Sequence, residues 1–457
     1  MNKAVNEREL VLDILMEVSE KGMYSHIVLR EVLSKYQYMD KKERAFITRV
    51  SEGTLEHMLE LDYILDQFSK VKVRKMKPVI RNILRSAVYQ LKYMDTVPDS
   101  AVCNEAVKLA VRKGFVNLKG FVNGVLRNVA RNLDNVKYPQ EELQRLSVRY
   151  SMPEWILKLW LQSYDGATVE RMLAAFQAET PLTVRCNLQH NAPEELVRKL
   201  TREGAVVQQH PYLPYAFTIS GYDYLADLDS FQNGDFYVQD VSSMLVGEIA
   251  SPKEGDTVMD VCAAPGGKSL HIAEKLNGTG RVQARDLSSY KVELIEDNIL
   301  RSGFQNIEAV VWDALELDES AKETADILLA DLPCSGLGVL GRKTDLKYKA
   351  TLENAQKLAE LQRQILQTVQ CYVKPGGKLL YSTCTIHAAE NMENVDWFLE
   401  HFPAFSLMDI RESLPEELKG DVQNRGCLQL LPGVHQSDGF FIAAFQKKAE
   451  SGKNKKE

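Results

Sequence analysis

The sequence predicts a multidomain protein with an all-α N-terminal domain, a small α+β module and a C-terminal α/β domain. Up to about residue 135, apolar residues recur at helical spacing and strand-like alternation is nearly absent. Residues 181–235 mix strands with a helix, and from about Gln239 strands and helices alternate. Such alternation indicates an open, mostly parallel sheet with helices on both faces. The 457 residues accommodate about two to four domains.

The first domain is predicted to span residues 1–135. Val11, Ile14, Leu15 and Val18 follow the i, i+3, i+4, i+7 pattern of a helix with one buried face. The same spacing recurs in residues 80–91 and 122–129. These features are typical of a small helical bundle. The polar stretch 132–139, which ends in a proline, is the expected linker.

Charge is unevenly distributed along the chain. The formal net charge of −7 argues against a generic nucleic-acid binder, but residues 1–150 hold 26 basic and 19 acidic side chains and the remainder is acidic. Eight basic residues and no acid lie in Lys70–Lys92, and six more, again without an acid, lie in Ala106–Arg131. A merely solvated helix face, which is the alternative, would normally mix both signs. Two such runs favour contact with phosphate.

The rest of the chain divides into an α+β module at 140–236, a core at 237–447 and a disordered basic tail at 448–457. The module has a strand at Leu182–Asn187, a helix at Pro193–Glu203 and turn-rich strands up to Gly234. The core strands, with helices between the first four, are predicted at Thr257–Ala263, Arg281–Asp286, Ile307–Trp312, Asp326–Ala330 and Lys378–Ser382. A closing pair, Leu428–Leu431 and Phe440–Gln446, is expected to be antiparallel.

Several classes of protein are disfavoured. No stretch approaches the roughly 18 apolar residues of a membrane span, and the charged N-terminus is unlike a signal peptide. Seven scattered cysteines without a CxxC pair fit a reducing cytosol and no zinc site. The histidines form no HxxxH or HExxH pair, so no catalytic metal is expected. We therefore expect a cytoplasmic protein.

The segment AAPGGK connects the first core strand to a helix. Gly266 and Gly267 allow a ligand close approach at the carboxyl edge of the sheet, whereas Pro265 departs from a phosphate loop. Aspartates follow the next strands at Asp286, Asp313 and Asp331. One such aspartate is often only a helix cap, but three after a glycine loop suit an adenosine-containing cofactor without a polyphosphate.

A nicotinamide cofactor is the rival interpretation of this edge. The literal GxGxxG of residues 336–341 is followed by RKTDLKYK rather than by an amphipathic helix, so the match is attributed to chance.

Two cysteines follow neighbouring strands of the predicted sheet. Cys334 in ADLPCSGLG follows the fourth strand and Cys384 in LLYSTCT follows the fifth, so both fall on the edge that carries the glycine loop. A strand-end loop supplies the exposed, polar setting that a nucleophilic thiolate needs. The other core and module cysteines are interpreted as small buried apolar residues: Cys186, Cys262, Cys371 and Cys427.

CAAPGGK, DLPCSG, YSTCT and LLPGVHQSDGFF resemble, in order and spacing, the motifs of RNA (cytosine-5-)-methyltransferases of the RsmB/NOP family. FVNGVLRN resembles the last helices of the NusB-like RNA-binding domain, and TPLTVRCN and FYVQDVSS resemble the accessory RNA-binding module and the entry to the core. The resemblance covers nearly the whole chain. It implies a Rossmann-like class I methyltransferase core that uses S-adenosylmethionine to methylate carbon-5 of a cytosine in 16S ribosomal RNA.

The resemblance also implies roles for single residues. Cys384 is the nucleophile that forms a covalent adduct with cytosine, and Cys334 assists product release. Asp331 hydrogen-bonds the cytosine and also lies at the cofactor, and Lys268 orders the charges of the site or has a structural role. The cofactor is expected along Cys262, Ala263, Ala264, Pro265, Gly266, Gly267 and Lys268, with Asp286 at the ribose and Asp313 near the adenine.

Two departures from the family pattern and four open alternatives remain. Arg285 stands where an apolar residue is usual, and Leu332 stands where Ala is common. The same chemistry could act on transfer RNA, another RNA or DNA, or the protein could be a non-catalytic RNA-binding scaffold. A monomer acting on free 16S RNA or on an early assembly intermediate is expected, without membrane or metal.

Overall fold

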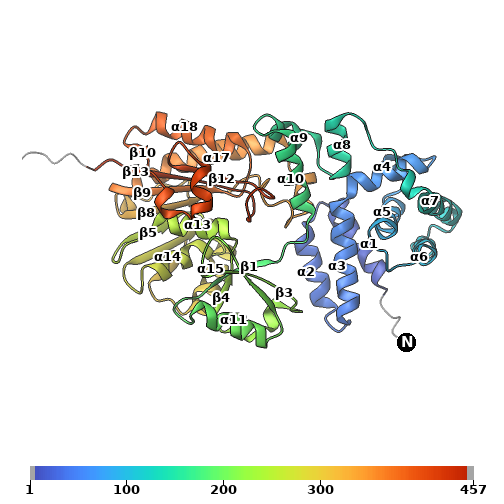
Figure 1. Cartoon of the computed structure of the whole chain (residues 1–457), viewed down its shortest axis with the longest axis horizontal. Coiled ribbons are helices and arrows are strands. Elements are labelled where there is room, and N and C mark those ends of the chain that lie inside the picture. Colours follow the sequence, from blue (N-terminus) through green and yellow to red (C-terminus); the bar gives the residue numbers. More distant parts are fainter. Residues whose placement is uncertain (1–5, 450–457) are drawn as a thin grey trace, which may run out of the picture. The chain divides into compact units, whose positions relative to one another are not determined.

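The computed structural model describes residues 6–449, so the predicted tail 448–457 lies almost wholly outside the described residues. Contacts divide the chain into two compact units (Figure 1). Unit 1 holds the residues up to Ala178 and Leu340–Thr351, and unit 2 holds Glu179–Val339 and the residues from Leu352 on. The predicted boundary at residue 135 therefore falls inside unit 1 and stays a prediction.

Unit 1 is all-helical over its described residues, which confirms the helical prediction for the N-terminal domain. Asn6 caps its first helix by accepting the Glu9 amide, Asp40 and Glu43 form a capping box on the third, and Pro78 occupies the first turn of the fifth. Leucine, isoleucine and valine side chains of the first seven helices form one core. The helices are α1 (Glu7–Ser19), α2 (Ser25–Lys35), α3 (Lys41–Glu56), α4 (Met58–Phe68), α5 (Pro78–Tyr93), α6 (Asp99–Arg112), α7 (Lys119–Asn132), α8 (Glu142–Arg149), α9 (Glu154–Leu161), α10 (Gly166–Gln177) and α16 (Leu346–Lys349), with 3-10 turns η1 (Val73–Lys75), η2 (Val116–Leu118) and η3 (Leu133–Asn135).

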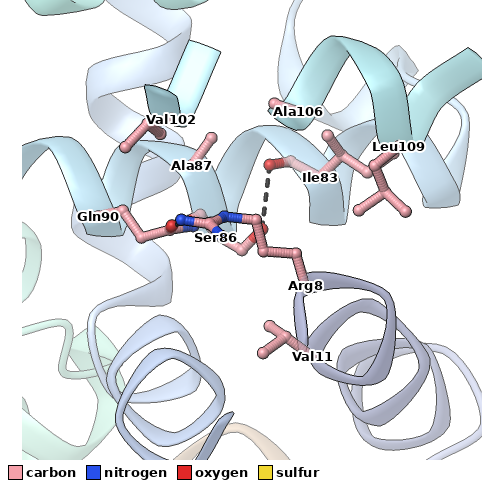
Figure 2. A pocket seen from close by; sticks show the side chains of 9 residues that line it. All are labelled: Arg8, Val11, Ile83, Ser86, Ala87, Gln90, Val102, Ala106 and Leu109. Carbon is pink, nitrogen blue, oxygen red and sulfur yellow. Dashed lines mark hydrogen bonds between the residues drawn. The ribbon is translucent and has the colours of Figure 1, made fainter. Parts of the chain in front are cut away.

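One small cavity lies between α1, α5 and α6 (Figure 2). Its volume of about 10 Å³ is room for one water at most. Arg8 closes it on one side by donating to Gln90 Oε1 at 3.1 Å, and the Ser86 hydroxyl donates to the Ile83 carbonyl. This part of the helical core is closely packed and offers no ligand site.

Unit 1 also contains the segment Leu340–Thr351, which we call the returning segment because the chain before and after it belongs to unit 2. Asp345 accepts hydrogen bonds from both the amide and the hydroxyl of Ser25. Lys347, which is buried, donates to the Glu56 carbonyl at 2.8 Å, and the Tyr348 hydroxyl donates to the same carbonyl at 3.1 Å. Burial lowers the pKa of Lys347 to about 8. The segment is thus an integral part of the helical unit.

Unit 2 begins with a four-stranded antiparallel sheet in the order β2-β3-β1-β4. Apolar residues of β1 and β3 pack against Leu196 and Leu200 of the module's helix. Its elements are β1 (Leu182–Cys186), α11 (Pro193–Arg202), β2 (Val206–Gln209), β3 (Ala216–Ser220), η4 (Leu225–Asp227), α12 (Asp229–Gln232) and β4 (Phe236–Val238).

The large sheet of unit 2 has the order β11-β12-β13-β9-β8-β5-β6-β7, with β10 on β13. The strands β7, β6, β5, β8 and β9 are parallel, and β13, β12, β11 and β10 are antiparallel. The predicted parallel sheet with an antiparallel closing pair is therefore confirmed. The strands are β5 (Thr257–Asp260), β6 (Arg281–Asp286), β7 (Ile307–Val311), β8 (Ala325–Asp331), β9 (Val373–Thr383), β10 (Phe405–Leu407), β11 (Val422–Gln423), β12 (Cys427–Leu430) and β13 (Phe440–Lys447).

Helices cover both faces of this sheet, as predicted. Residues of alternate parity along β5 and β8 enter two different cores, since Val258 and Leu329 pack with one set of helices and Met259 and Leu328 with the other. The first set is α13 (Val241–Ala250), α14 (Gly267–Lys275) and α15 (Ser289–Ser302), and the second is α17 (Leu352–Val369) and α18 (Met392–His401). The remaining 3-10 turns are η5 (Glu319–Ala321), η6 (Gln370–Tyr372), η7 (Ala388–Glu390), η8 (Arg411–Ser413) and η9 (Glu416–Asp421).

The helix predicted between β7 and β8 is wrong, because only the short turn η5 occurs there. Asp313 accepts the Leu315 amide at 2.9 Å, and Asp318 accepts the Ser320 amide at 3.0 Å. Such local side-chain bonds compete with helical backbone bonds. The acidic residues of this connection therefore stabilise turns.

Candidate active site

The two cysteines of the strand-end loops lie side by side. The parallel strands β8 and β9 pair Asp331 with Ser382, and Cys334 and Cys384 follow a few residues later. Their Sγ atoms are 3.1 Å apart. The hydrogen bond to Cys384, with burial as the second cause, raises the pKa of the Cys334 thiol well above its ordinary value. Either sulfur can be the donor in this contact.

A half-buried ion pair accompanies the cysteines at the same edge. Lys268 Nζ lies 2.6 Å from one carboxylate oxygen of Asp331, and the Ser382 hydroxyl donates to the other at 2.8 Å. Burial opposes the charge of Lys268, but the Asp331 carboxylate outweighs it and raises the pKa of Lys268. Nζ also lies 5.2 Å from the centre of the Phe440 ring. The Asp331 carboxylate is thus fixed by two donors at this edge.

The glycine loop connects β5 to α14. Ala264–Pro265 is a cis peptide, and Gly266 has a φ of +102°, where a side chain would be strained and its Cβ would lie 3.3 Å from Ile295. A Cβ at Gly267, by contrast, would meet protein atoms only at 3.8 Å or more. The protein itself therefore requires glycine at 266 and leaves space beside 267.

Asp286, at the end of β6, holds this loop. Its carboxylate accepts the amides of Ala264 at 3.0 Å and Leu287 at 2.8 Å, and the ammonium of Lys291 lies 3.0 Å away. A carboxylate offers about four lone-pair sites, so these three donors leave room for one more. Lys291 is half exposed and can yield its place to a ligand hydroxyl.

The other predicted cofactor residues have more ordinary surroundings. Ala263 is buried, and burial, chiefly, raises the pKa of the half-buried Cys262, in keeping with its interpretation as a small apolar residue. Asp313 caps the turn that follows β7 and is half-buried. The structure thus brings Cys334, Cys384, Asp331 and Lys268 together, with the loop and Asp286 on the strands next to them.

Sequence reasoning missed Asp260. The predicted first strand ran through this residue to Ala263, whereas the observed strand ends at it. Asp260 is buried and accepts the Ser269 hydroxyl of α14 at 2.6 Å. Burial raises the pKa of Asp260 to about 7. The signal that could have found it is the same as for Asp286, namely an aspartate at the end of a parallel strand.

The departure at Arg285 is accommodated by a polar layer outside the loop. Its guanidinium forms an ion pair with Asp318 at 2.7 Å and lies over the rings of Trp312 and Tyr372. The side chain is buried in this setting. Arg285 therefore packs as part of the sheet face and leaves the Asp286 carboxylate in place.

Another buried ion pair links the α+β module to the helix after the glycine loop. Arg185 of β1 pairs with Glu274 of α14, and its Nε donates to Gln239 Oε1 at 2.8 Å. Glu274 also accepts the Leu188 amide, and the guanidinium lies over the Tyr237 ring. The module is therefore attached to α14 through a desolvated charge pair.

The basic runs of unit 1 divide into paired and exposed cations. Arg81, Arg85 and Lys92 of the first run form ion pairs with acids outside it. Its other five cations are exposed in the connection between α4 and α5, here called the basic loop: Lys70, Lys72, Arg74, Lys75 and Lys77. Asn128 of α7 donates to the Phe68 carbonyl at 2.8 Å, which places the second run's helix beside this loop. Fewer cations are therefore available for phosphate contact than the sequence indicated, and those of the first run are concentrated in the basic loop.

The large sheet, with a glycine loop and two cysteines at the carboxyl edge of its strands, is that of a Rossmann-like methyltransferase. A family described as 16S rRNA methyltransferase RsmB/F matches residues 248–446, the NusB family matches residues 5–131, and an RsmF/B-like ferredoxin-like domain matches residues 152–222. The chain belongs to the ribosomal RNA small subunit methyltransferase B family.

Similar proteins extend over the whole chain. A probable ribosomal RNA small subunit methyltransferase B of Bacillus subtilis is 36% identical over 98% of this chain and 100% of its own length. Its counterpart in Synechocystis is 31% identical over 97% of this chain and 100% of its own. The crystal structure of PH0851 matches with a TM-score of 0.80 at 24% identity, over 98% of this chain and 100% of that one, and shows the same fold.

Within residues 6–449, no helix has the length and apolar character that crossing a membrane requires. Over the same residues, no cluster of three or more His, Cys, Asp or Glu side chains could hold a metal ion.

Proposed function

We propose that this protein methylates carbon-5 of a cytosine in 16S ribosomal RNA, with S-adenosylmethionine as the donor and through a covalent bond from Cys384 to the base. The observation that carries the proposal is the pair of thiols, 3.1 Å apart, at the edge that also holds the glycine loop. Addition to cytosine requires one thiolate, and the later release of the product requires a second group that accepts the carbon-5 proton.

The residues present fit the proposed cofactor. The space beside Gly267 and the remaining acceptor capacity of Asp286 suit the close approach and the ribose of a nucleoside. The predicted contacts along Cys262–Lys268, at Asp313 and at Asp331 remain part of this proposal. The cofactor supplies an electrophilic methyl group.

The side chains account for activation of the base. Carbon-5 of cytosine is a poor nucleophile until a thiolate adds to carbon-6. In this proposal Cys384, whose sulfur lies 3.1 Å from that of Cys334, is the thiolate that adds to carbon-6. In this proposal Asp331, which accepts hydrogen bonds from Lys268 and Ser382, also hydrogen-bonds the cytosine edge. Once carbon-5 is methylated, Cys334 assists release by accepting the carbon-5 proton, and the sulfur–carbon bond breaks with its electron pair returning to Cys384.

In this proposal unit 1 supplies the RNA-binding surface. The basic loop and the exposed Lys119, Arg127 and Arg131 of α7 offer eight cations for phosphate contact. The target base must leave its stack to reach the cysteines, as in other enzymes that act on bases. The substrate is free 16S RNA or an early assembly intermediate, and we propose a cytoplasmic monomer.

Mass-spectrometric mapping of 5-methylcytosine in 16S RNA, with and without the protein, tests the substrate. Modification at one 16S position supports the proposal. Modification of transfer RNA alone would refute 16S RNA as the substrate and keep the proposed chemistry. Cys384→Ser should abolish methyl transfer, and Cys334→Ala should accumulate a protein–RNA adduct on denaturing gels. Full activity of Cys384→Ser would refute the assigned nucleophile, and a wild type that binds RNA but not S-adenosylmethionine would indicate a scaffold.

A further inference from the structure

We infer that the consecutive residues Glu390 and Asn391 are positioning residues, one for each catalytic cysteine. This inference rests on the proposed function and adds to it. Both residues are buried at the end of η7, behind the edge where the cysteines lie. We call the two side chains the clamp.

Glu390 holds the loop of Cys334. Its carboxylate accepts the amide of Ser335 at 2.8 Å and also the Ser335 hydroxyl. Gln362 donates to Glu390 at 3.0 Å and to the Pro333 carbonyl at 2.9 Å. Pro333 and Ser335, the residues immediately before and after Cys334, are thus both fixed by Glu390 and its partner Gln362.

Asn391 holds the loop of Cys384 in the same manner. Its Oδ1 accepts the Thr383 hydroxyl at 2.6 Å, and its Nδ2 donates to the Thr385 carbonyl at 3.0 Å. Gln429 of β12 accepts from the same Nδ2 at 2.8 Å. The residues on either side of Cys384 are therefore fixed by a single amide.

The two halves of the clamp are joined to each other. The Oγ atoms of Ser335 and Thr385 are 2.7 Å apart. Because the single Ser335 hydroxyl proton goes to the Glu390 carboxylate, which can only accept, the Thr385 hydroxyl is the donor in this bond. The direction of each bond from Thr385 to Ser335 to Glu390 is thus determined, and this chain sets the distance between the cysteines that each residue follows.

Among the described residues, no lysine or arginine forms an ion pair with Glu390. His387 Nδ1 lies 3.0 Å from its Oε1, so four donors converge on the two oxygens. A buried carboxylate saturated in this way is rigid and costly to disturb. Since misplacement of a reacting group by about 1 Å can cost about 100-fold in rate, the clamp acts on the rate of the chemical steps.

The test compares the near-isosteric variants Glu390→Gln and Asn391→Asp with the wild type and with Glu393→Gln, an exposed control on the adjacent turn. For both clamp variants, kcat for methyl transfer should fall about 100-fold while KM for RNA stays within about twofold. Asn391→Asp should slow formation of the covalent adduct, and Glu390→Gln should let the adduct accumulate. Glu393→Gln should behave as wild type.

A conservative pair tests the link between the loops. Thr385→Ser retains the hydroxyl and should keep most of the rate, whereas Thr385→Val removes it and should lose at least tenfold. If Glu390→Gln does not fold at the assay temperature, this pair carries the same prediction. Equal rates in Thr385→Val and Thr385→Ser, or wild-type kcat in the clamp variants, would overturn the inference.

A measurement without RNA separates this inference from the proposed function. Diamide oxidises two neighbouring thiols to a disulfide, with the two protons and two electrons passing to the reagent. The rate of Cys334–Cys384 disulfide formation, followed by mass spectrometry, should fall at least tenfold in both clamp variants. If the clamp variants form the disulfide at the wild-type rate, the clamp is refuted whatever the substrate is. If the wild type is inactive on RNA but the clamp variants still form the disulfide more slowly, only the proposed function is refuted.

Discussion

Replacing Glu274 by Gln removes the charge that neutralises Arg185 in the link between the α+β module and α14. Arg185 is 0% exposed and Glu274 is 6% exposed, so neither charge has access to bulk water. The variant keeps the size of the side chain but leaves a buried guanidinium without its counter-charge. We expect a large loss of stability in unit 2.

The magnitude follows from the burial. Breaking a buried ion pair by removing one partner costs about 3–5 kcal/mol. At about 2–4 °C per kcal/mol for a unit of this size, even the lower figure predicts a fall in Tm of about 6–12 °C. Replacing both residues, as in Arg185→Met with Glu274→Leu, should recover most of this loss, because no uncompensated charge remains.

Differential scanning calorimetry of the full chain measures the effect. The control is Glu195→Gln, which breaks the pair with Arg198 in the same module, where the side chains are 37% and 62% exposed. Exposed pairs contribute about 0–1 kcal/mol, so this Tm should move by no more than about 2–4 °C. A Glu274→Gln transition within 1 °C of wild type would refute the reasoning, as would a double variant no more stable than the single one.

Three further predictions concern the site and the RNA interface. Asp260 has a pKa of about 7 in the folded protein against about 3.9 unfolded, so the stability it provides is lost as pH rises from about 4 to 7. The free energy of unfolding of Asp260→Asn, relative to that of the wild type, should therefore rise by about 3 kcal/mol between pH 5 and pH 8. The same difference between the two proteins at both pH values would contradict this. In Gly338→Ala the new Cβ would lie 2.0 Å from the Gly439 carbonyl oxygen and disturb the backbone bond from the 338 amide to Cys384, so methyl transfer should fall at least 100-fold with cofactor affinity unchanged in calorimetry. Replacing the five cations of the basic loop by Gln should weaken RNA binding and flatten its dependence on salt. The logarithmic slope should fall by about 0.7–0.9 for each phosphate that the variant no longer neutralises, and an unchanged slope would exclude the loop from the interface.

The features that the sequence predicts well are those set by neighbouring residues. Strand–helix alternation gives the order of the core elements, and the ends of two neighbouring parallel strands determine that Cys334 and Cys384 meet. Asp286 was identified for the same reason, because carboxylates at strand ends lie at one edge. These predictions need only periodicity and the direction of parallel strands.

The features that it does not predict depend on contacts between distant residues. Glu390 acts through Ser335, 55 positions earlier, and Arg185 through Glu274, 89 positions later. Nothing in the local pattern distinguishes such residues from solvated polar ones. The absent helix after β7 has a local cause instead, since Asp313 and Asp318 bond to nearby amides in competition with a helix.

The returning segment Leu340–Thr351 has a consequence for how this protein can be divided. The chain passes between the two units three times, after Ala178, after Val339 and after Thr351, and the second passage begins only five residues beyond Cys334. A protein cut at residue 179 would keep Lys347 and Asp345 but lose Glu56 and Ser25, which satisfy them. Unit 2 is therefore not expected to be separable by a single cut. The helical unit contains not only the N-terminal part of the chain but also the segment Leu340–Thr351, which follows the Cys334 loop.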